Sequence, residues 1–111
     1  MTVIAERVLT LLGSDGSKSS IPARVFAPEM KDGAWFCAVE IGWPRGAKRM
    51  EAGGVDSVQA LLIGMQIIGT WLYTSEEHKR GQLYFERPDS GYGFPVPRGL
   101  RDCLVGDDLQ E

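Results

Sequence analysis

Apolar and polar residues alternate along the first half of the chain with the period of a β-strand. The clearest run is AWFCAVEIGW, residues 34–43, in which every second residue is apolar. Successive side chains of a strand point to opposite faces, so this run predicts a strand with one face in a core and a mixed face that carries Glu40. The residues predicted for the core face are Trp35, Cys37, Val39, Ile41 and Trp43.

Two further strands are predicted before it. Residues 2–12 are rich in Val, Ile and Leu and end at the turn sequence GSDGSKSS, which predicts a hairpin with a partner at residues 21–27. Pro22 and Pro28 bracket this partner and favour an edge position, because proline cannot donate a ladder hydrogen bond. PEMKDG, residues 28–33, is predicted to be a turn, and RGAKRMEAGG, residues 45–54, a polar connection.

A long apolar segment, GGVDSVQALLIGMQIIGTWLY at residues 53–73, predicts a helix. Asp56 is a suitable N-cap, and Gln59 three residues later completes a pattern like a capping box. The helix is predicted to run to about Thr74, where SEEHKRG stops it with Gly81 past its end. A fourth strand at residues 82–86 and one helical turn at residues 99–105 complete the predicted elements.

This order of elements, β-β-β-α-β, predicts an α+β fold. An antiparallel sheet of about four strands would pack on one long apolar helix, with a short helical turn near the C-terminus. At 111 residues the chain has the size of a single domain, residues 1–111, and we expect an acidic tail from about residue 106.

The helix is apolar around roughly 220° of its circumference, although a one-sided surface helix needs only about 100°. Gln59, Gln66 and Thr70 interrupt the apolar run, so it is not expected to span a membrane. Its second flank needs a cover, and two candidates stay open. One is the irregular C-terminal segment with Tyr92 and Phe94, and the other is a second copy of the chain in a homodimer.

Two glycines within the helix bear on this cover. Gly64 and Gly69 each cost about 1 kcal/mol of helix stability relative to alanine. Close approach of a neighbouring backbone would explain them, so we expect a glycine-bearing flank to pack tightly on a strand or helix. The flank in need of a cover carries either Ala60, Gly64, Ile67 and Trp71 or Val58, Leu62 and Gly69.

Composition and charge narrow the classes of function. A net charge of −3, from 12 basic and 15 acidic residues, makes nucleic acid an unfavourable partner. Binding of single-stranded RNA by Trp43, Arg45, Lys48 and Arg49 is the weakest hypothesis. The first residues, MTVIAERVLTLL, lack a basic start, so no signal peptide is expected and the protein is predicted to be cytoplasmic.

No motif for catalysis, a cofactor or a metal accompanies these elements in the sequence. GGVDS lacks the lysine of a phosphate-binding loop. His78 is the only histidine and is expected at the surface, whereas Cys37 and Cys103 are expected to be reduced and buried. The acidic residues near the end are expected to form a solvated tail, and they are Asp102, Asp107, Asp108 and Glu111. We therefore predict no catalytic residue, no cofactor and no metal.

The segments EIGWP, GGVDSVQALL and YGFP, in this order and spacing, resemble a family of small bacterial proteins described only as a domain of unknown function. The resemblance covers roughly residues 35–105 and implies no activity, cofactor or catalytic residue. It implies a bacterial, cytosolic source. It also implies a shared framework that includes Trp43, Asp56, Gln59 and the YGFP stretch.

The favoured hypothesis is a non-enzymatic protein that acts by association, as a homodimer or with a protein partner. One version of it is a small acidic immunity-type protein that covers the surface of a toxin. The possible interaction surface comprises Trp43, Arg45, Ala60, Gly64, Ile67, Trp71, Tyr92 and Phe94. The alternative is a small ligand-binding domain or enzyme with a site near Glu40, Arg45, Asp56, Gln59 and Tyr92.

Overall fold

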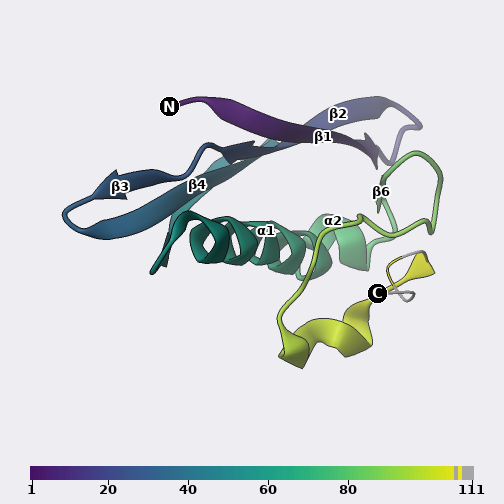
Figure 1. Cartoon of the computed structure of the whole chain (residues 1–111). Helices are drawn as coiled ribbons and strands as arrows, with labels where there is room; N and C mark the ends of the chain where they lie inside the picture. Colours follow the sequence, from purple (N-terminus) through teal and green to yellow (C-terminus); the bar gives the residue numbers. More distant parts are fainter. Residues whose placement is uncertain (107, 109–111) are drawn as a thin grey trace.

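The computed structural model describes residues 1–106 and 108 and shows an α+β fold (Figure 1). An antiparallel sheet of six strands forms one layer, and the long helix α1 lies along one of its faces. The C-terminal segment runs past α1 on the side away from the sheet (Figure 1). The elements are β1 (Val3–Leu12), β2 (Lys18–Phe26), β3 (Glu29–Lys31), β4 (Ala34–Trp43), β5 (Gly46–Gly54), α1 (Ser57–Tyr73), α2 (Glu76–Lys79), β6 (Leu83–Tyr84) and the 3-10 turn η1 (Arg98–Cys103).

Five strands succeed one another across the sheet in the order β5-β4-β2-β1-β6. β5 pairs with β4 along nearly its whole length, from Trp35 opposite Gly54 to Trp43 opposite Gly46. β2 and the short β3 therefore share the other edge of β4, with β3 near its start and β2 near its end. All these pairings are antiparallel, which confirms the predicted fold class.

The prediction of about four strands is wrong, because β3 and β5 were expected to be a turn and a connection. β5 is an edge strand, and of its residues only Ala52 is buried. Such a strand lacks the apolar alternation that marks a half-buried one. β3 has three residues, all exposed, so it carries no apolar signal either.

β2 lies inside the sheet, between β1 and β4, and not at the edge that its prolines suggested. Its ladder with β4 runs only from Ala23 to Val25. Pro22 lies just beyond this ladder, so its missing N–H removes no bond from it. β2 also ends at Phe26, before Pro28.

The core face predicted for β4 is confirmed. Cys37, Val39 and Ile41 are fully buried, Trp43 is nearly so, and Trp35 packs beside them. α1 covers this face, and Gly64 lets it approach closely, because a Cβ there would lie 3.0 Å from Val39 Cγ1. The core therefore lies between β4 and its neighbours on one side and α1 on the other.

The predicted start and end of the helix are also confirmed. Gln59 N donates a hydrogen bond of 2.8 Å to Asp56 Oδ1, and Gln59 Oε1 accepts one of 2.7 Å from Val55 N. α1 ends at Tyr73, but SEEHKRG then forms the separate short helix α2, which Ser75 caps. Within residues 1–106 and 108, no helix is long and apolar enough to cross a membrane.

The C-terminal segment covers the part of the second flank of α1 that carries Gly69, whereas Val58 and Leu62 of the same flank are exposed. Its Tyr92, Phe94 and Val96 belong to the same buried core as the helix. A Cβ at Gly69 would lie 2.2 Å from the carbonyl oxygen of Pro95, so this glycine allows the segment to cross the helix in backbone contact. Of the two covers left open by the sequence, the structure of the single chain provides the first at Gly69 and leaves Val58 and Leu62 uncovered.

Candidate functional site

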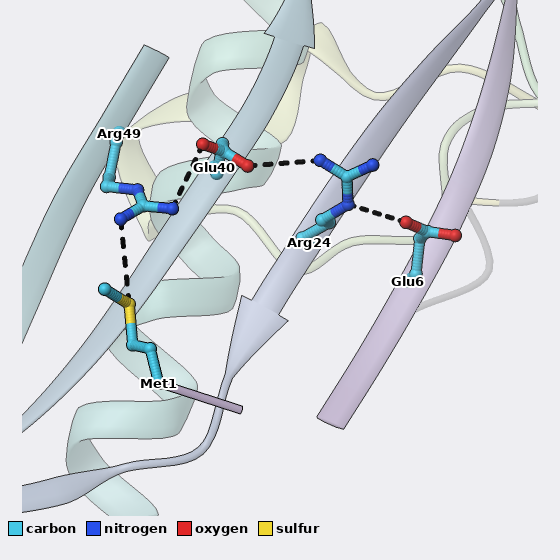
Figure 2. Close-up of polar contacts among 5 residues, drawn as sticks. All are labelled: Met1, Glu6, Arg24, Glu40 and Arg49. Atoms are coloured by element: carbon cyan, nitrogen blue, oxygen red, sulfur yellow. Dashed lines mark hydrogen bonds and ion pairs between the residues drawn. The ribbon is translucent and has the colours of Figure 1, made fainter. Parts of the chain in front are cut away.

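The face of the sheet opposite α1 is open, since no helix of the described chain lies over it (Figure 1). Four charged side chains form a row across this face, one from each of the adjacent strands β1, β2, β4 and β5 (Figure 2). In strand order they are Glu6, Arg24, Glu40 and Arg49, and we call them the charge row.

Each member of the charge row bonds its neighbour. Arg24 Nε donates to Glu6 Oε2 at 2.7 Å, and Arg24 Nη1 donates to Glu40 Oε2 at 3.2 Å. Arg49 Nη2 donates to Glu40 Oε1 at 3.2 Å (Figure 2). Strand register places each residue directly opposite the next, so the signs alternate −, +, −, + across four strands.

The ion pairs of the charge row order its side chains more than they stabilise the fold. Hydrogen bonds, first to Glu6 and then to Glu40, raise the pKa of the Arg24 guanidinium. Glu40 is 15% exposed, while Arg24, Glu6 and Arg49 are 36%, 40% and 45% exposed. Exposed ion pairs of this kind add little to stability, because water and salt screen them. Their main effect is to fix an alternating pattern of charge on an open surface.

An uncharged row flanks the charge row on one side. Val8 lies opposite Pro22, and Gly42 lies opposite Ala47. Gly42 also faces Pro22, because a Cβ on the glycine would lie 2.9 Å from Pro22 Cγ. Val8 is 47% exposed, so apolar surface lies beside the ordered charges. We call these four residues the apolar row.

On the other side of the charge row lies Phe26. The Arg49 guanidinium stacks over its ring at 4.9 Å. Arg49 Nη1 also donates to Met1 Sδ at 3.7 Å (Figure 2). Phe26 is only 6% exposed, although it is separate from the main core cluster. Arg49 is therefore held in place by an aromatic ring, a sulfur atom and a carboxylate.

A second polar cluster lies where the C-terminal segment meets α1 and α2. The Asp108 carboxylate accepts a hydrogen bond from the Tyr73 hydroxyl and bonds of 2.8 Å from Tyr92 N and Gly93 N. His78 Nδ1 lies 2.5 Å from the Tyr92 hydroxyl oxygen. Burial raises the pKa of both tyrosine hydroxyls and lowers that of His78. The polar groups of this cluster bond one another and hold the segment in place.

Two expectations about this cluster are wrong. Asp108 was expected in a solvated tail but is 4% exposed, and His78 was expected at the surface but is half-buried. Their contacts join residues 14 to 35 positions apart, which no local pattern reveals. Asp107 and Glu111, the other end residues of the expected tail, lie outside the described residues.

The cysteines differ from each other. Cys37 is buried as expected and its Sγ donates to the carbonyl oxygen of Phe26 at 3.3 Å, and burial raises the pKa of its thiol. Cys103 is exposed on η1, so the expectation that it is buried is wrong. Among the residues that the structure describes, no three His, Cys, Asp or Glu side chains lie close enough to hold a metal ion.

An apolar groove of about 230 Å³ lies between β1 and the first half of α1. Its charged lining residues are engaged elsewhere. Glu6 belongs to the charge row, while Arg7 Nη1 donates to the carbonyl oxygen of Tyr92 at 2.9 Å and its guanidinium lies 4.4 Å from the centre of the Phe85 ring. Without converging free polar groups, such a groove offers packing but little orientation to a small ligand.

Five residues of the predicted interaction surface face the interior. They are Trp43, Ala60, Gly64, Tyr92 and Phe94, all of them buried. In the single chain they pack the core between sheet, helix and C-terminal segment. They present no surface to a partner in this arrangement.

The other three residues of that surface remain accessible. Ile67 and Trp71 are half-buried and line a shallow depression together with Met50 of β5. Arg45 is exposed, stacks over Trp43 at 4.9 Å and pairs with Glu77 at 3.1 Å.

The residues of the alternative ligand site do not converge. Glu40 points to the open face of the sheet, whereas Tyr92 is buried on the side of α1, so the sheet lies between them. Asp56 and Gln59 are engaged in capping α1. The basic group of the RNA hypothesis is split as well, since Lys48 stacks on Trp71 while its neighbour Arg49 lies on the opposite face.

Comparison with known families bears on identity. A family model described as Domain of unknown function (DUF6968) matches residues 5–96, most of the chain. The chain belongs to this family. The DUF6968 match starts and ends earlier than the resemblance at residues 35–105, and it includes the whole charge row but not η1. No curated protein and no solved structure matches the chain.

Sequence reasoning missed Glu6 and Arg24 as members of a surface cluster. Their place on the open face follows from the alternation of side chains between the two faces of a strand. Glu40 was placed on the face of β4 away from the core, and any charged residue opposite it on a paired strand shares that face. To find these residues from the sequence, one must know the strand register and that β5 exists, and local patterns supplied neither.

Proposed function

We propose that this member of the DUF6968 family acts without catalysing a reaction, by associating with protein through the open face of its sheet. One observation carries the proposal: four adjacent strands hold the charge row and the apolar row in fixed register on a face that no described helix covers. Protein interfaces combine ordered charges with apolar surface. The charges provide specificity and the apolar area provides affinity.

The contacts of the other polar cluster indicate that its role is structural. His78 and Tyr92 bond each other, and Asp108 is saturated by two backbone N–H groups and a tyrosine hydroxyl. Within the described chain, no buried side-chain nitrogen or oxygen lacks a partner. A nucleophile or general base needs a reactive atom that is free to meet a substrate.

The proposal includes two kinds of partner. A second copy of the chain would make the open face a homodimer interface, and a different protein, such as a toxin in the immunity-type hypothesis, would cover the same face in a heterodimer. Both use the same residues of β1, β2, β4 and β5.

Site-specific photo-cross-linking in the cells that make the protein tests this proposal. A photoreactive residue replaces Val8, in the apolar row, and in a matched control it replaces Val58, which is 71% exposed on α1. We expect a protein adduct from position 8 that is absent from position 58. Ala47→Lys, which places a bulky charge in the apolar row, should reduce that adduct. Equal adducts at both positions, or none at position 8, would overturn the proposal.

A further inference from the structure

We infer that the partner of the open face is a second copy of this chain, stacked face to face. This inference rests on the proposed function and deepens it by naming the occupant. It comes from the order of charges in the charge row, which is negative, positive, negative and positive from β1 to β5. The row has an even number of members, and reversing its order inverts every sign.

This order is self-complementary under one two-fold rotation. The axis runs parallel to the strands, in the plane between the copies, and passes between β2 and β4. Rotation about it places the first member of one row over the fourth of the other, and the second over the third. Glu6 then faces Arg49 of the second copy, and Arg24 faces its Glu40. Each of the four charges in one copy meets an opposite charge, as an isologous interface requires.

The alternative two-fold axis fails the same test. An axis in the interface plane but perpendicular to the strands places each member of the charge row over its own copy. Glu6 would face Glu6, and Arg24 would face Arg24. Like charges brought together at an interface are strongly unfavourable, so the charge row selects the axis along the strands. That axis also stacks the sheets with nearly aligned strands, the usual geometry of a β-sandwich.

The neighbouring rows fit the selected axis. Rotation about an axis along the strands preserves position along them, so the apolar row meets the apolar row. Val8 then lies over Ala47 of the second copy, and Pro22 over its Gly42. All four residues are uncharged, so no charge is buried there without a partner. On the other flank, Glu51 is already paired with Lys31 at 2.8 Å.

Preorganisation of the charges also favours this occupant. Each charged side chain of the row is already bonded within its own chain, at 2.7 to 3.2 Å. Stacking therefore buries no isolated charge and orders no free side chain.

The size of the open face gives the expected area of the interface. Four strands about 4.8 Å apart, each with nine or so residues about 3.3 Å apart, give a face of about 600 Å² per copy. The total of about 1,200 Å² lies at the lower end of specific interfaces, so we expect a reversible dimer and not an obligate one.

Inverting the charge row tests the inference at constant net charge. The variant carries Glu6→Arg, Arg24→Glu, Glu40→Arg and Arg49→Glu, so its own row reads +, −, +, − and stays self-complementary. We expect it to form dimers with itself, as measured by sedimentation velocity at concentrations above the dissociation constant. Mixed dimers with the wild type would bring like charges together and should fall at least about tenfold below the statistical share, as measured by native mass spectrometry.

A cysteine-trapping experiment keeps the inference testable if the inverted variant does not fold. In a Cys103→Ser background, Val8→Cys and Ala47→Cys are made as separate proteins. Facing positions of two stacked sheets lie about 10 Å apart, whereas like positions of the two copies are also displaced sideways by three strand spacings, about 14 Å. We expect a covalent dimer when the two variants are mixed and treated with a bifunctional thiol cross-linker that spans about 10 Å. Neither variant alone should form it.

The outcomes separate this inference from the proposed function. A monomer at all concentrations, a cross-link of Val8→Cys with itself, or mixed dimers at the statistical share overturns the second copy as occupant. If position 8 still yields an adduct with a different protein in cells, the proposed function stands and only the inference fails. If the adduct is this chain and the cysteines trap as expected, both stand.

Discussion

Asp108 ties the end of the described chain to the rest of the domain through several hydrogen bonds. Its carboxylate takes hydrogen bonds from Tyr92 N, Gly93 N and the Tyr73 hydroxyl, and its side chain is almost fully buried. Tyr92 and Gly93 begin the segment that covers α1, and Tyr73 ends α1 itself. One carboxylate therefore joins three parts of the chain.

Asp108→Ala should destabilise the protein strongly. It leaves two backbone N–H groups and one hydroxyl without their acceptor in a buried site, and we expect the free energy of unfolding to fall by about 3 kcal/mol. Urea denaturation measures this change. Asp102→Ala is the matched control, since Asp102 is exposed on η1, and it should change the stability by less than about 0.5 kcal/mol. Equal losses in the two variants would contradict this role.

His78 makes the stability depend on pH. Burial holds its pKa below the ordinary value of 6.5, so on acidification the unfolded chain binds a proton before the folded one. The stability contributed by the neutral ring is therefore present above that ordinary value and is lost as the pH falls below it. The Tyr92 hydroxyl and the Tyr73 ring face the imidazole and supply no charge that offsets this loss.

We therefore expect the Tm of the wild type to fall more than that of His78→Gln as the pH drops from about 7 to about 5. Calorimetry at closely spaced pH values measures both. Carboxylates titrate in the two proteins alike, so the difference between the curves isolates the histidine. A constant difference across this range would show that His78 does not carry the effect.

Residues of this kind lie at the limit of sequence reasoning. The sequence shows the residue type and charge of Asp108 and His78, yet both side chains were expected to be solvated. Their burial depends on partners up to 35 positions away. Asp56 and Gln59, whose partners lie within four positions, were predicted correctly.

At the scale of elements, α1 is packed on two sides, and a glycine allows each contact. Gly64 faces β4, where the nearest atoms are the side-chain atoms Val39 Cγ1 at 3.0 Å and Cys37 Sγ at 3.3 Å. Gly69 faces the backbone of the C-terminal segment at Pro95. Side-chain atoms can shift by a few tenths of an ångström, whereas a backbone carbonyl is held by its own segment.

We therefore expect Gly69→Ala to destabilise more than Gly64→Ala. Alanine gains about 1 kcal/mol of helix propensity at either position. At position 69 the clash with the Pro95 carbonyl should outweigh this gain and leave a net loss of about 2 kcal/mol. At position 64 gain and loss should nearly cancel. Thermal denaturation compares the two variants, and a smaller loss for Gly69→Ala would refute the assigned contact.

The elements that sequence reasoning recovered are those with a core side. β4 buries one face and α1 packs on two sides, so apolar residues recur along both with a recognisable period. β5 buries only Ala52 and was mistaken for a loop. The covering of α1 by the C-terminal segment was one of two open alternatives, because periodicity shows that a flank is apolar but not what lies on it.

At the scale of the whole molecule, the open face decides whether the structure has two layers, as in the single chain, or more, as in the inferred dimer. The sheet has α1 on one side, and in the inferred dimer a second sheet would lie on the other. The association then depends on charge as well as on apolar contact. The charge row was beyond sequence reasoning because it needs the register of four strands, one of them unrecognised.

Self-association should accordingly weaken with salt. Screening shortens the range of charge interactions from about 13 Å at 0.05 M to about 3 Å at 1 M, so we expect the dissociation constant of the dimer to rise several-fold over that range. Sedimentation equilibrium measures it. The Tm of dilute, monomeric protein is the control and should change little, because the pairs add little to folding. Stronger association at high salt would indicate an interface driven by apolar contact alone.

The even number of charges in the row has a consequence for recognition among relatives. A row of four alternating signs is the negative of its own reversal, and it therefore matches itself. A row of three alternating signs on three strands reads the same in both directions, so the same kind of rotation would bring like charges together. A relative with such a row would need a partner of the opposite pattern. An even or odd number of charged strands can in this way decide between homophilic and heterophilic pairing without any change of fold.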